Sequence, residues 1–268
     1  MNALCQMTGL SRAGFYRWRL PRQATPVEME LRDQMQKVAL ESPAYGYRRI
    51  TCDLRQRGFD VNHKRVLRMM REDNLLCVRR RAFVVTTDSR HNLPVYPNLA
   101  REIKPTAINQ LWVADITYIR LRTEFVYLAV VLDAFSRRVI GWALGRTLEA
   151  GLAVTALRMA LIERQPLPGL VHHSDRGVQY ASTDYTEMLK QHHVTISMSR
   201  KGNPYDNAAC ESFMKTLKQE EVYRNEYRDF HEARASIGEF LECIYNQKRL
   251  HSALGYVPPA EFENGATQ

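Results

Sequence analysis

Apolar residues recur at helical spacing in three segments of the first part of the chain. Residues 28–41, 47–56 and 64–73 each carry such a stripe, and the pattern predicts three helices. Gly58 is placed to end the second helix, and Asn62 is placed to cap the third. The side chains expected to be buried in the first and third helices are Met29, Leu31, Met35, Val38, Leu40, Val66, Leu67, Met69 and Met70.

The pattern changes after residue 109, where short β-branched and apolar runs alternate with amphipathic segments. Three runs follow one another directly, and two more are separated by helical segments. A meander followed by alternating helix and strand is typical of a layered α/β fold. The predicted strands are 111–119, 125–133, 138–144, 169–174 and 194–198. The predicted helices are 148–164, 183–191, 208–219 and 231–246.

The chain therefore divides into a basic start, a small all-helical domain, a linker and a large α/β domain, at residues 1–25, 26–81, 82–108 and 109–268. Pro94 and Pro97 disfavour helix in the linker. In the first segment, Ser11 is placed to cap a helix over 12–19, which would be the second half of a helix-turn-helix. A disordered basic end is the alternative, and the sequence alone leaves both open.

The net charge of +9 is distributed unevenly along the chain. Residues 1–108 contain 20 Lys and Arg against 10 Asp and Glu, a net +10, whereas residues 109–268 contain 18 against 19, a net −1. A polyanion bound to the first part would release counterions, which favours nucleic acid as the partner. The second and third helices suit a reader of the major groove or the phosphate backbone. A plain three-helix bundle with a basic face is the alternative. The candidate DNA-binding residues here are Arg48, Arg49, Lys64, Arg65 and Arg68.

Several classes of protein are disfavoured by what the sequence lacks. The five cysteines are odd in number and form no Cys-x-x-Cys pair, which argues against a disulfide framework and against structural zinc. No apolar run is long enough for a membrane helix, and the first residues carry no signal-peptide core. We therefore expect a cytoplasmic protein with no membrane partner.

Three acidic residues stand out by their positions. Asp115 interrupts an apolar strand, Asp175 follows the end of another, and Glu211 opens a helix. A carboxylate inside an apolar strand is costly unless a partner compensates it. Mg²⁺ is such a partner, because it takes one or two carboxylates and completes its shell with water and phosphate oxygens. Taken alone, Asp115 is equally well explained as a buried acid satisfied by hydrogen bonds.

Longer motifs around the three acids carry a family resemblance. The runs WVADITYI at 112–119, HHSDRGVQY at 172–180 and GNPYDNAACESF at 202–213 resemble the three acidic blocks of insertion-sequence transposases with a retroviral-integrase-like core. The 35 residues between Asp175 and Glu211 match the spacing of this Asp-Asp-Glu family. The segment from Tyr245 through Arg249 and His251 to the run GYVPP resembles its C-terminal signature. The likeness runs from about residue 26 to the end.

The resemblance implies a ribonuclease-H-like fold, a five-stranded mixed sheet with flanking helices, preceded by the small helix-turn-helix-like domain. It implies that Asp115, Asp175 and Glu211 are catalytic and hold two Mg²⁺ or Mn²⁺ ions, and that the reaction is cleavage and transfer of DNA strands. The partners implied are double-stranded DNA, both element ends and target, and a homo-oligomer assembled on it. The chain resembles a second-frame (OrfB) product, for which a first-frame protein is a possible partner or fusion.

Basic and polar residues near the third acid are further candidates for DNA contact. Glu211, Lys215 and Lys218 fall at i, i+4 and i+7, so they share one helical face. Lysines there can hold phosphates beside the scissile bond, although an ordinary i,i+4 pair is the alternative for Lys215. The Gly-, Asn- and Pro-rich loop at 200–207 is expected to order on DNA, with contacts from Arg200, Asn203 and Asn207. The adjacent His172 and His173 are given no catalytic role.

Three functions compete on these grounds. The favoured one is a transposase that cleaves and joins DNA at the ends of a mobile element. A nuclease that cuts RNA in hybrids is disfavoured by the basic helical domain ahead of the core. A catalytically inactive DNA-binding regulator of transposition is disfavoured by the intact acidic trio.

Overall fold

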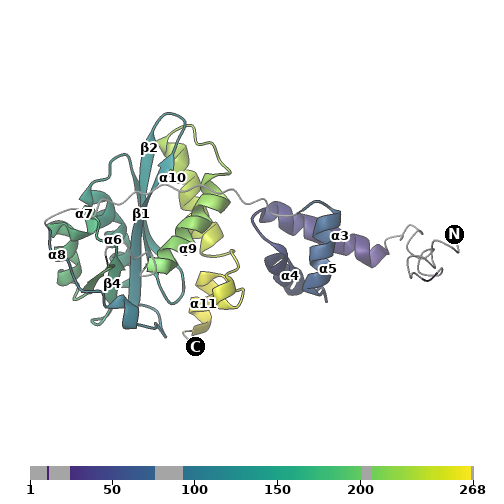
Figure 1. Cartoon of the computed structure of the whole chain (residues 1–268), viewed down its shortest axis with the longest axis horizontal. Coiled ribbons are helices and arrows are strands. Elements are labelled where there is room, and N and C mark those ends of the chain that lie inside the picture. Colours follow the sequence, from purple (N-terminus) through teal and green to yellow (C-terminus); the bar gives the residue numbers. More distant parts are fainter. Residues whose placement is uncertain (1–10, 12–24, 76–92, 201–206, 267–268) are drawn as a thin grey trace. The chain divides into compact units, whose positions relative to one another are not determined.

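The computed structural model describes residue 11 and residues 25–75, 93–200 and 207–266 (Figure 1). The helix expected over 12–19 and the expected DNA contact Asn203 lie outside the described residues. The chain forms two compact units, Met1–Cys77 and Val78–Gln268, which are treated separately below. Within the described ranges, no helix is long and apolar enough to cross a membrane.

The first unit contains the three predicted helices, α3 (Pro26–Glu41), α4 (Tyr47–Gln56) and α5 (His63–Glu72). Thr25 caps α3 by accepting a hydrogen bond from the Glu28 amide at 3.3 Å. Gly58, with a φ of +90°, follows α4 in the left-handed region that favours glycine. Asn62 accepts from the Lys64 amide at 2.8 Å and starts α5 as predicted.

The core of this unit is built from one stripe of each helix. Leu31, Met35 and Val38 are buried on α3, and they pack with buried side chains of α4 and α5, namely Ile50, Leu54, Val66, Met69 and Met70. The expectation that Met29 and Leu40 are buried is wrong, since they are 62% and 80% exposed. The spacing of the three buried residues defines a narrow stripe, and Met29 and Leu40 fall outside it.

The second unit is built on a five-stranded mixed sheet, as predicted, in the order β3-β2-β1-β4-β5. The first three strands form an antiparallel meander, and β4 and β5 continue the sheet in parallel with β1. Their bounds are β1 (Leu111–Arg120), β2 (Phe125–Asp133), β3 (Val139–Gly145), β4 (Val171–Ser174) and β5 (Thr195–Met198). Each predicted strand is present, with ends that shift by one or two residues.

Helices cover both faces of the sheet (Figure 1). On one face, side chains of α9 (Ala208–Leu217) and α10 (Phe230–Glu239) share an apolar cluster with β1 and β2. On the other, α6 (Ala150–Arg164) and α8 (Thr183–Gln191) share a second cluster with the sheet. The shorter helices are α7 (Val178–Ala181), α11 (Pro259–Ala266), η1 (Ala100–Glu102) and η5 (Ser252–Leu254).

Residues 93–108, the later part of the predicted linker, pack on the second unit. Leu93 and Tyr96 lie against the cluster that includes α6 and α8. The amides of Leu99 and Ala100 donate to the Ser197 hydroxyl of β5 at 2.9 and 3.3 Å. This part of the chain therefore supports the edge strand β5.

Two predicted helices widen into π-helical turns. The first, η3 (Lys218–Val222), continues α9, and the amide of Tyr223 donates to the Lys218 carbonyl five residues back at 2.9 Å. The second, η4 (Phe240–Tyr245), continues α10. Such turns insert one residue into a helix and are frequent at functional sites. The sequence predicted uninterrupted helices here, because apolar spacing alone does not resolve a one-residue insertion.

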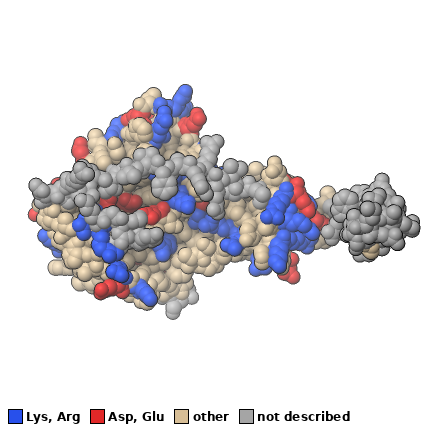
Figure 2. All heavy atoms as spheres, viewed as in Figure 1, with Lys and Arg blue, Asp and Glu red and all other residues tan. Residues whose placement is uncertain are grey.

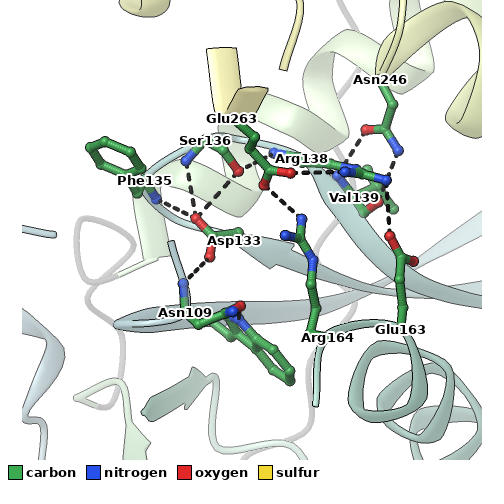
Figure 3. A network of polar contacts seen from close by, with 11 residues as sticks. Asn109, Asp133, Phe135, Ser136, Arg138, Val139, Glu163, Arg164, Asn246 and Glu263 are labelled. Atoms are coloured by element: carbon green, nitrogen blue, oxygen red, sulfur yellow. Dashed lines mark hydrogen bonds and ion pairs between the residues drawn. The ribbon is translucent and has the colours of Figure 1, made fainter. Parts of the chain in front are cut away.

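Buried polar groups fasten the C-terminal end to the sheet (Figure 3). Asp133 accepts from the Asn109 amide at 2.7 Å and closes the end of β2. Glu263 of α11 accepts from Arg138 at 2.8 Å and from Arg164 at 2.6 Å. Because each buried charge has a partner, α11 is held against α6 and the turn before β3.

The contact between β3 and α6 yields a stability prediction. A Cβ added at Gly141 would lie 2.2 Å from the Ala156 carbonyl oxygen, a backbone atom that has no freedom to move away. We expect Gly141→Ala to lower the free energy of unfolding by about 3 kcal/mol or more, because the strand and helix must separate. The matched control is Gly151→Ala in α6, where an added Cβ meets nothing within 4 Å and should be neutral or stabilising. Denaturant unfolding measures both, and equal stability of the two variants would contradict this account.

Candidate functional site

The first two acids are neighbours because of the register between β1 and β4. The parallel pairing aligns Val113 with His173. Continued for two residues, the same register sets Asp115 opposite Asp175, which directly follows the end of β4. Adjacent strands lie about 4.8 Å apart, so the two carboxylates leave neighbouring backbone positions. Residues 60 positions apart in the chain thus enter one site.

Backbone amides orient both carboxylates. An oxygen of Asp115 accepts from the Ile116 amide at 2.9 Å. An oxygen of Asp175 accepts from the Gly177 amide at 2.8 Å. A Cβ at Gly177 would lie 2.9 Å from this Asp175 oxygen, so the turn after β4 depends on the small residue. These bonds fix the direction in which each carboxylate points.

The third acid enters from α9. Side chains alternate along β1, and Val113 and Ile119 belong to the cluster beneath α9, so Asp115 points to the same face. The side-chain amide of Asn207, at the start of α9, donates a hydrogen bond to the Ala114 backbone carbonyl at 3.1 Å. Glu211 lies four residues after Asn207 and therefore on the same side of the helix. This hydrogen bond holds the first turn of α9, which carries Glu211, against Ala114, the residue before Asp115.

The pKa values reflect this crowding of negative charge. The pKa of Asp115 is raised to about 7, first by burial and then by the charges of Asp175 and Glu211. The Ile116 amide and Lys218 offset part of that rise. Burial also raises the pKa of Glu211. Three carboxylates therefore share one electrostatic field in which ionised Asp115 is disfavoured unless a cation joins them.

The donor set fits a hard divalent cation. All three candidate ligands are carboxylates, and Mg²⁺ prefers oxygen donors while keeping several waters. Among the residues that the structure describes, no three His, Cys, Asp or Glu side chains lie close enough together to hold a metal ion. The chemistry of the three acids therefore suits Mg²⁺, but their side chains are not gathered into a ligand set in this structure.

Lys218 stands at the edge of this field. It is half-buried at the junction of α9 and the π-helical turn, and its Nζ lies 4.9 Å from the centre of the Tyr118 ring. Burial lowers its pKa, and the charge of Asp115 opposes that effect. Lys218 is therefore close enough to the acids to affect their charge. The other lysine predicted on this face, Lys215, is exposed.

The two histidines beside the second acid are parts of the core. The ring nitrogens of buried His173 lie 2.8 Å from the hydroxyl of Ser197, in β5, and 3.0 Å from that of Ser199, which directly follows β5. Nε2 of His172 lies 3.0 Å from the Tyr185 hydroxyl of α8. Burial lowers the pKa of His172 to about 3, so its ring is neutral at physiological pH. These contacts attach β4 to its neighbouring strand β5 and to helix α8.

The predicted DNA contacts occupy different environments. Arg200 is exposed at the end of the described segment 93–200, whereas Asn207 is buried with its amide on Ala114. In the helical unit, Arg48, Lys64 and Arg68 are exposed, and Arg49 and Arg65 are half-buried. Figure 2 shows Lys and Arg gathered on this unit, and acidic and basic atoms side by side on the core unit. A DNA contact by any of these residues stays a prediction, and for Asn207 the fold already uses the side-chain nitrogen.

Sequence reasoning missed two features of the site. The tether from Asn207 to Ala114 joins residues 93 positions apart, so no local pattern reveals it. Tyr118 and Tyr223 were assigned no role, although an aromatic residue three positions after Asp115 on the same strand was visible in the sequence. Its side chain leaves the opposite face of β1 from Asp115, and its link to the acids is the contact with Lys218.

Family models cover both units. An HTH-like domain matches residues 26–83, and integrase core domain models match residues 105–204 and 192–259. The chain is 40% identical to the insertion element IS600 uncharacterized 31 kDa protein of Shigella sonnei, over 97% of both chains. It is 37% identical to the transposase InsF for insertion sequence IS3A of Escherichia coli (strain K12), over 98% of this chain and 94% of that one.

The fold is shared more widely than the sequence. A chain of the simian T-cell lymphotropic virus intasome, solved in complex with the PP2A regulatory subunit B56 gamma, aligns with a TM-score of 0.51 at 14% identity. The alignment covers 86% of this chain and 74% of that one. The core unit therefore has the ribonuclease-H-like fold that the sequence predicted.

The raised pKa of Asp115 predicts how stability depends on pH without metal. Between the usual aspartate pKa of about 4 and the folded value of about 7, the folded chain binds more protons than the unfolded chain, so stability falls as pH rises. Asp115→Asn removes this loss. We expect the variant to be more stable than the parent by roughly 2–4 kcal/mol above pH 7, and by much less near pH 4.

Thermal unfolding in a metal chelator at several pH values measures this difference. Glu187→Gln, an exposed residue of α8, is the matched control and should show no comparable trend. A difference between Asp115→Asn and its parent that is independent of pH would refute the electrostatic origin.

Proposed function

The chain belongs to the family of insertion sequence IS3 transposases with an integrase core domain, and from this premise we propose that it cleaves DNA strands at the ends of a mobile element and transfers them to a target. Asp115, Asp175 and Glu211 are the proposed catalytic trio of a polynucleotidyl transferase that also acts as a nuclease. One observation carries the proposal. The β1–β4 register makes the first two acids neighbours, and the charge of the third reaches Asp115.

The proposed cofactor is Mg²⁺ or Mn²⁺, with two ions per site. When bound, such ions polarise the scissile phosphate and make the attacking water or 3′-hydroxyl more nucleophilic. The three carboxylates would hold them, with the Ile116 and Gly177 amides fixing the orientation of two of the acids. Phosphate oxygens of the substrate would complete the coordination, as Mg²⁺ commonly requires.

Basic residues of the core position the DNA in this proposal. Lys218 is held by Tyr118 within reach of the acidic field, which suits contact with a phosphate next to the scissile one. Lys215 is exposed one turn closer to Glu211. Arg200 and Asn203 are proposed to contact DNA from the segment ahead of α9. Asn207 is better accounted for as the anchor of that helix.

The helical unit is proposed to bind the element ends. The HTH-like match and the exposed Arg48, Lys64 and Arg68 support this assignment. Arg49 lies on α4 and Arg65 lies on α5, the two helices that also carry the exposed cations. The active form is proposed to be a homo-oligomer on element and target DNA in the cytoplasm, with a first-frame protein as a further partner. An inactive regulator is less well supported, because all three acids are retained in one electrostatic field.

The acidic trio provides the test of this function. Asp175→Asn should reduce strand cleavage and strand transfer by at least about 10³-fold, since the site loses a ligand while the fold keeps an isosteric side chain. Binding to end DNA should stay within about two-fold of the parent. An assay with labelled end DNA and Mg²⁺ measures the reactions, and a gel shift in Ca²⁺ measures binding. Glu187→Gln should behave as the parent in both, and normal strand transfer by Asp175→Asn would overturn the assignment.

Salt dependence tests the role of the helical unit. The double change Lys64→Gln and Arg68→Gln should weaken binding of the full chain to duplex DNA and reduce the slope of log affinity against log salt by about 2, one for each lost phosphate contact. Lys190→Gln, an exposed residue of the core helix α8, is the control and should leave the slope unchanged. Fluorescence anisotropy at several salt concentrations gives the slopes. An unaltered slope in the double variant would mean that these two residues do not contact phosphates.

A further inference from the structure

Two large aromatic side chains are exposed on the β1–β2 hairpin and on the segment after the π-helical turn. Phe125 at the start of β2 is 53% exposed, and Tyr223 after the π-helical turn is 40% exposed. Phe125 packs edge-on against half-buried Tyr118 of β1, with ring centres 5.9 Å apart and an interplanar angle of 63°. Aromatic rings left open to solvent in this way keep faces available for a ligand.

These rings lie at the free end of the β1–β2 hairpin. Tyr118 follows Asp115 by three residues, roughly 10 Å along the strand, and its side chain leaves the opposite face of β1. Phe125 pairs with Arg120, so it lies roughly 17 Å along the hairpin from Asp115. The pairing with β4 involves residues 111–113 of β1, so β4 does not flank β1 at Tyr118. Figure 1 shows the hairpin end reaching beyond α6, α7 and α8. The link to the acids is Lys218, whose Nζ lies over the Tyr118 ring and whose charge reaches Asp115.

The segment after the π-helical turn meets the same hairpin. The Arg122 amide, in the hairpin turn, donates to the Tyr227 carbonyl at 3.4 Å, and Tyr223 lies four residues before Tyr227. Burial raises the pKa of Tyr223, and the charge of Tyr118 adds to that rise. Tyr223 is thus carried by the segment that contacts the hairpin turn.

Positive charge surrounds these rings. The Nζ of Lys218 lies 4.9 Å from the Tyr118 ring centre. Arg120, Arg122 and Arg224 are exposed on the hairpin and on the segment after the π-helical turn. Aromatic rings for bases and cations for phosphates are the combination by which proteins bind single-stranded nucleic acid without reading its sequence.

We infer that Tyr118, Phe125 and Tyr223 form an aromatic platform that stacks unpaired bases of a DNA strand next to the acidic site. The inference rests on the proposed function and adds a subsite to it. Bases a few nucleotides from the scissile phosphate would leave the duplex and stack on the exposed rings of Phe125 and Tyr223. Lys218, held on Tyr118, would contact the backbone between the platform and the acids. A protein partner would have no need for the surrounding cations, so we commit to DNA.

The experiment uses the full chain and an end-DNA duplex with a short single-stranded overhang that contains 2-aminopurine. Binding is measured in Ca²⁺, and stacking on a ring should quench the fluorescence. Tyr223→Leu and Phe125→Ser should each reduce the quenching and weaken overhang binding about five-fold or more, since a stacked base contributes ~1–3 kcal/mol. Binding of the blunt duplex should change less than two-fold. Tyr223→Trp should restore the quenching, because a larger ring replaces the lost one.

Leu167→Ala is the matched control, an apolar residue of the same unit that is 82% exposed. It should leave both measurements unchanged. Unaltered quenching in both Tyr223→Leu and Phe125→Ser would overturn the platform, as would equal behaviour of Tyr223→Leu and Tyr223→Trp. Strand transfer by the parent chain in Mg²⁺ is assayed separately. Failure there with intact quenching would count against the proposed catalysis and for the platform.

Discussion

The parallel pairing of β1 with β4 is the constraint on which the rest of the core unit depends. It sets Asp115 beside Asp175, and the placement is unfavourable by itself, because burial and like charges raise the pKa of Asp115 to about 7. The surrounding structure must therefore enforce the register. His172 and His173 do so through hydroxyl partners on α8 and near β5, and the apolar clusters on both faces prevent the strands from separating. Packing away from the acids thus stabilises an arrangement that is electrostatically unfavourable for the acids themselves.

The third acid is held by a different means, through a helix anchored at both ends. Asn207 ties the start of α9 to β1, and buried Arg249 binds Glu220 with two bonds of 2.7 Å beyond the helix end. In the same turn, buried Glu221 accepts from the hydroxyls of Tyr227 and Ser236 at 2.8 and 2.6 Å. The C-terminal motif that includes Arg249 therefore acts on the site indirectly. It fixes the helix that carries Glu211 and the turn that carries Lys218.

Much of this arrangement could be predicted from sequence, for identifiable reasons. Strands such as 125–133 are continuous apolar runs bounded by turn residues, and Asn62 and Gly58 have few conformational alternatives, so local patterns locate them. The 35-residue spacing and the motifs led to the choice of the three acids, whose catalytic role stays a prediction. The tether of Asn207 could not be predicted, since it joins residues 93 positions apart, and the π-helical turns leave no trace in apolar spacing. Met29 and Leu40 were misplaced because two apolar residues at near-helical spacing can still miss the buried stripe.

In the proposed function, the repulsion among the three acids affects how DNA and metal bind together. A closed cage of three carboxylates would satisfy a cation without substrate and leave little reason to recruit a phosphate. Here the acids repel one another, and Lys218 supplies only partial compensation from the edge of the field. In the proposed function, cations relieve that repulsion and phosphate oxygens complete the coordination of the cations, so metal and DNA are each expected to strengthen binding of the other. The stability lost by crowding three acids would then be recovered in the complex with metal and DNA.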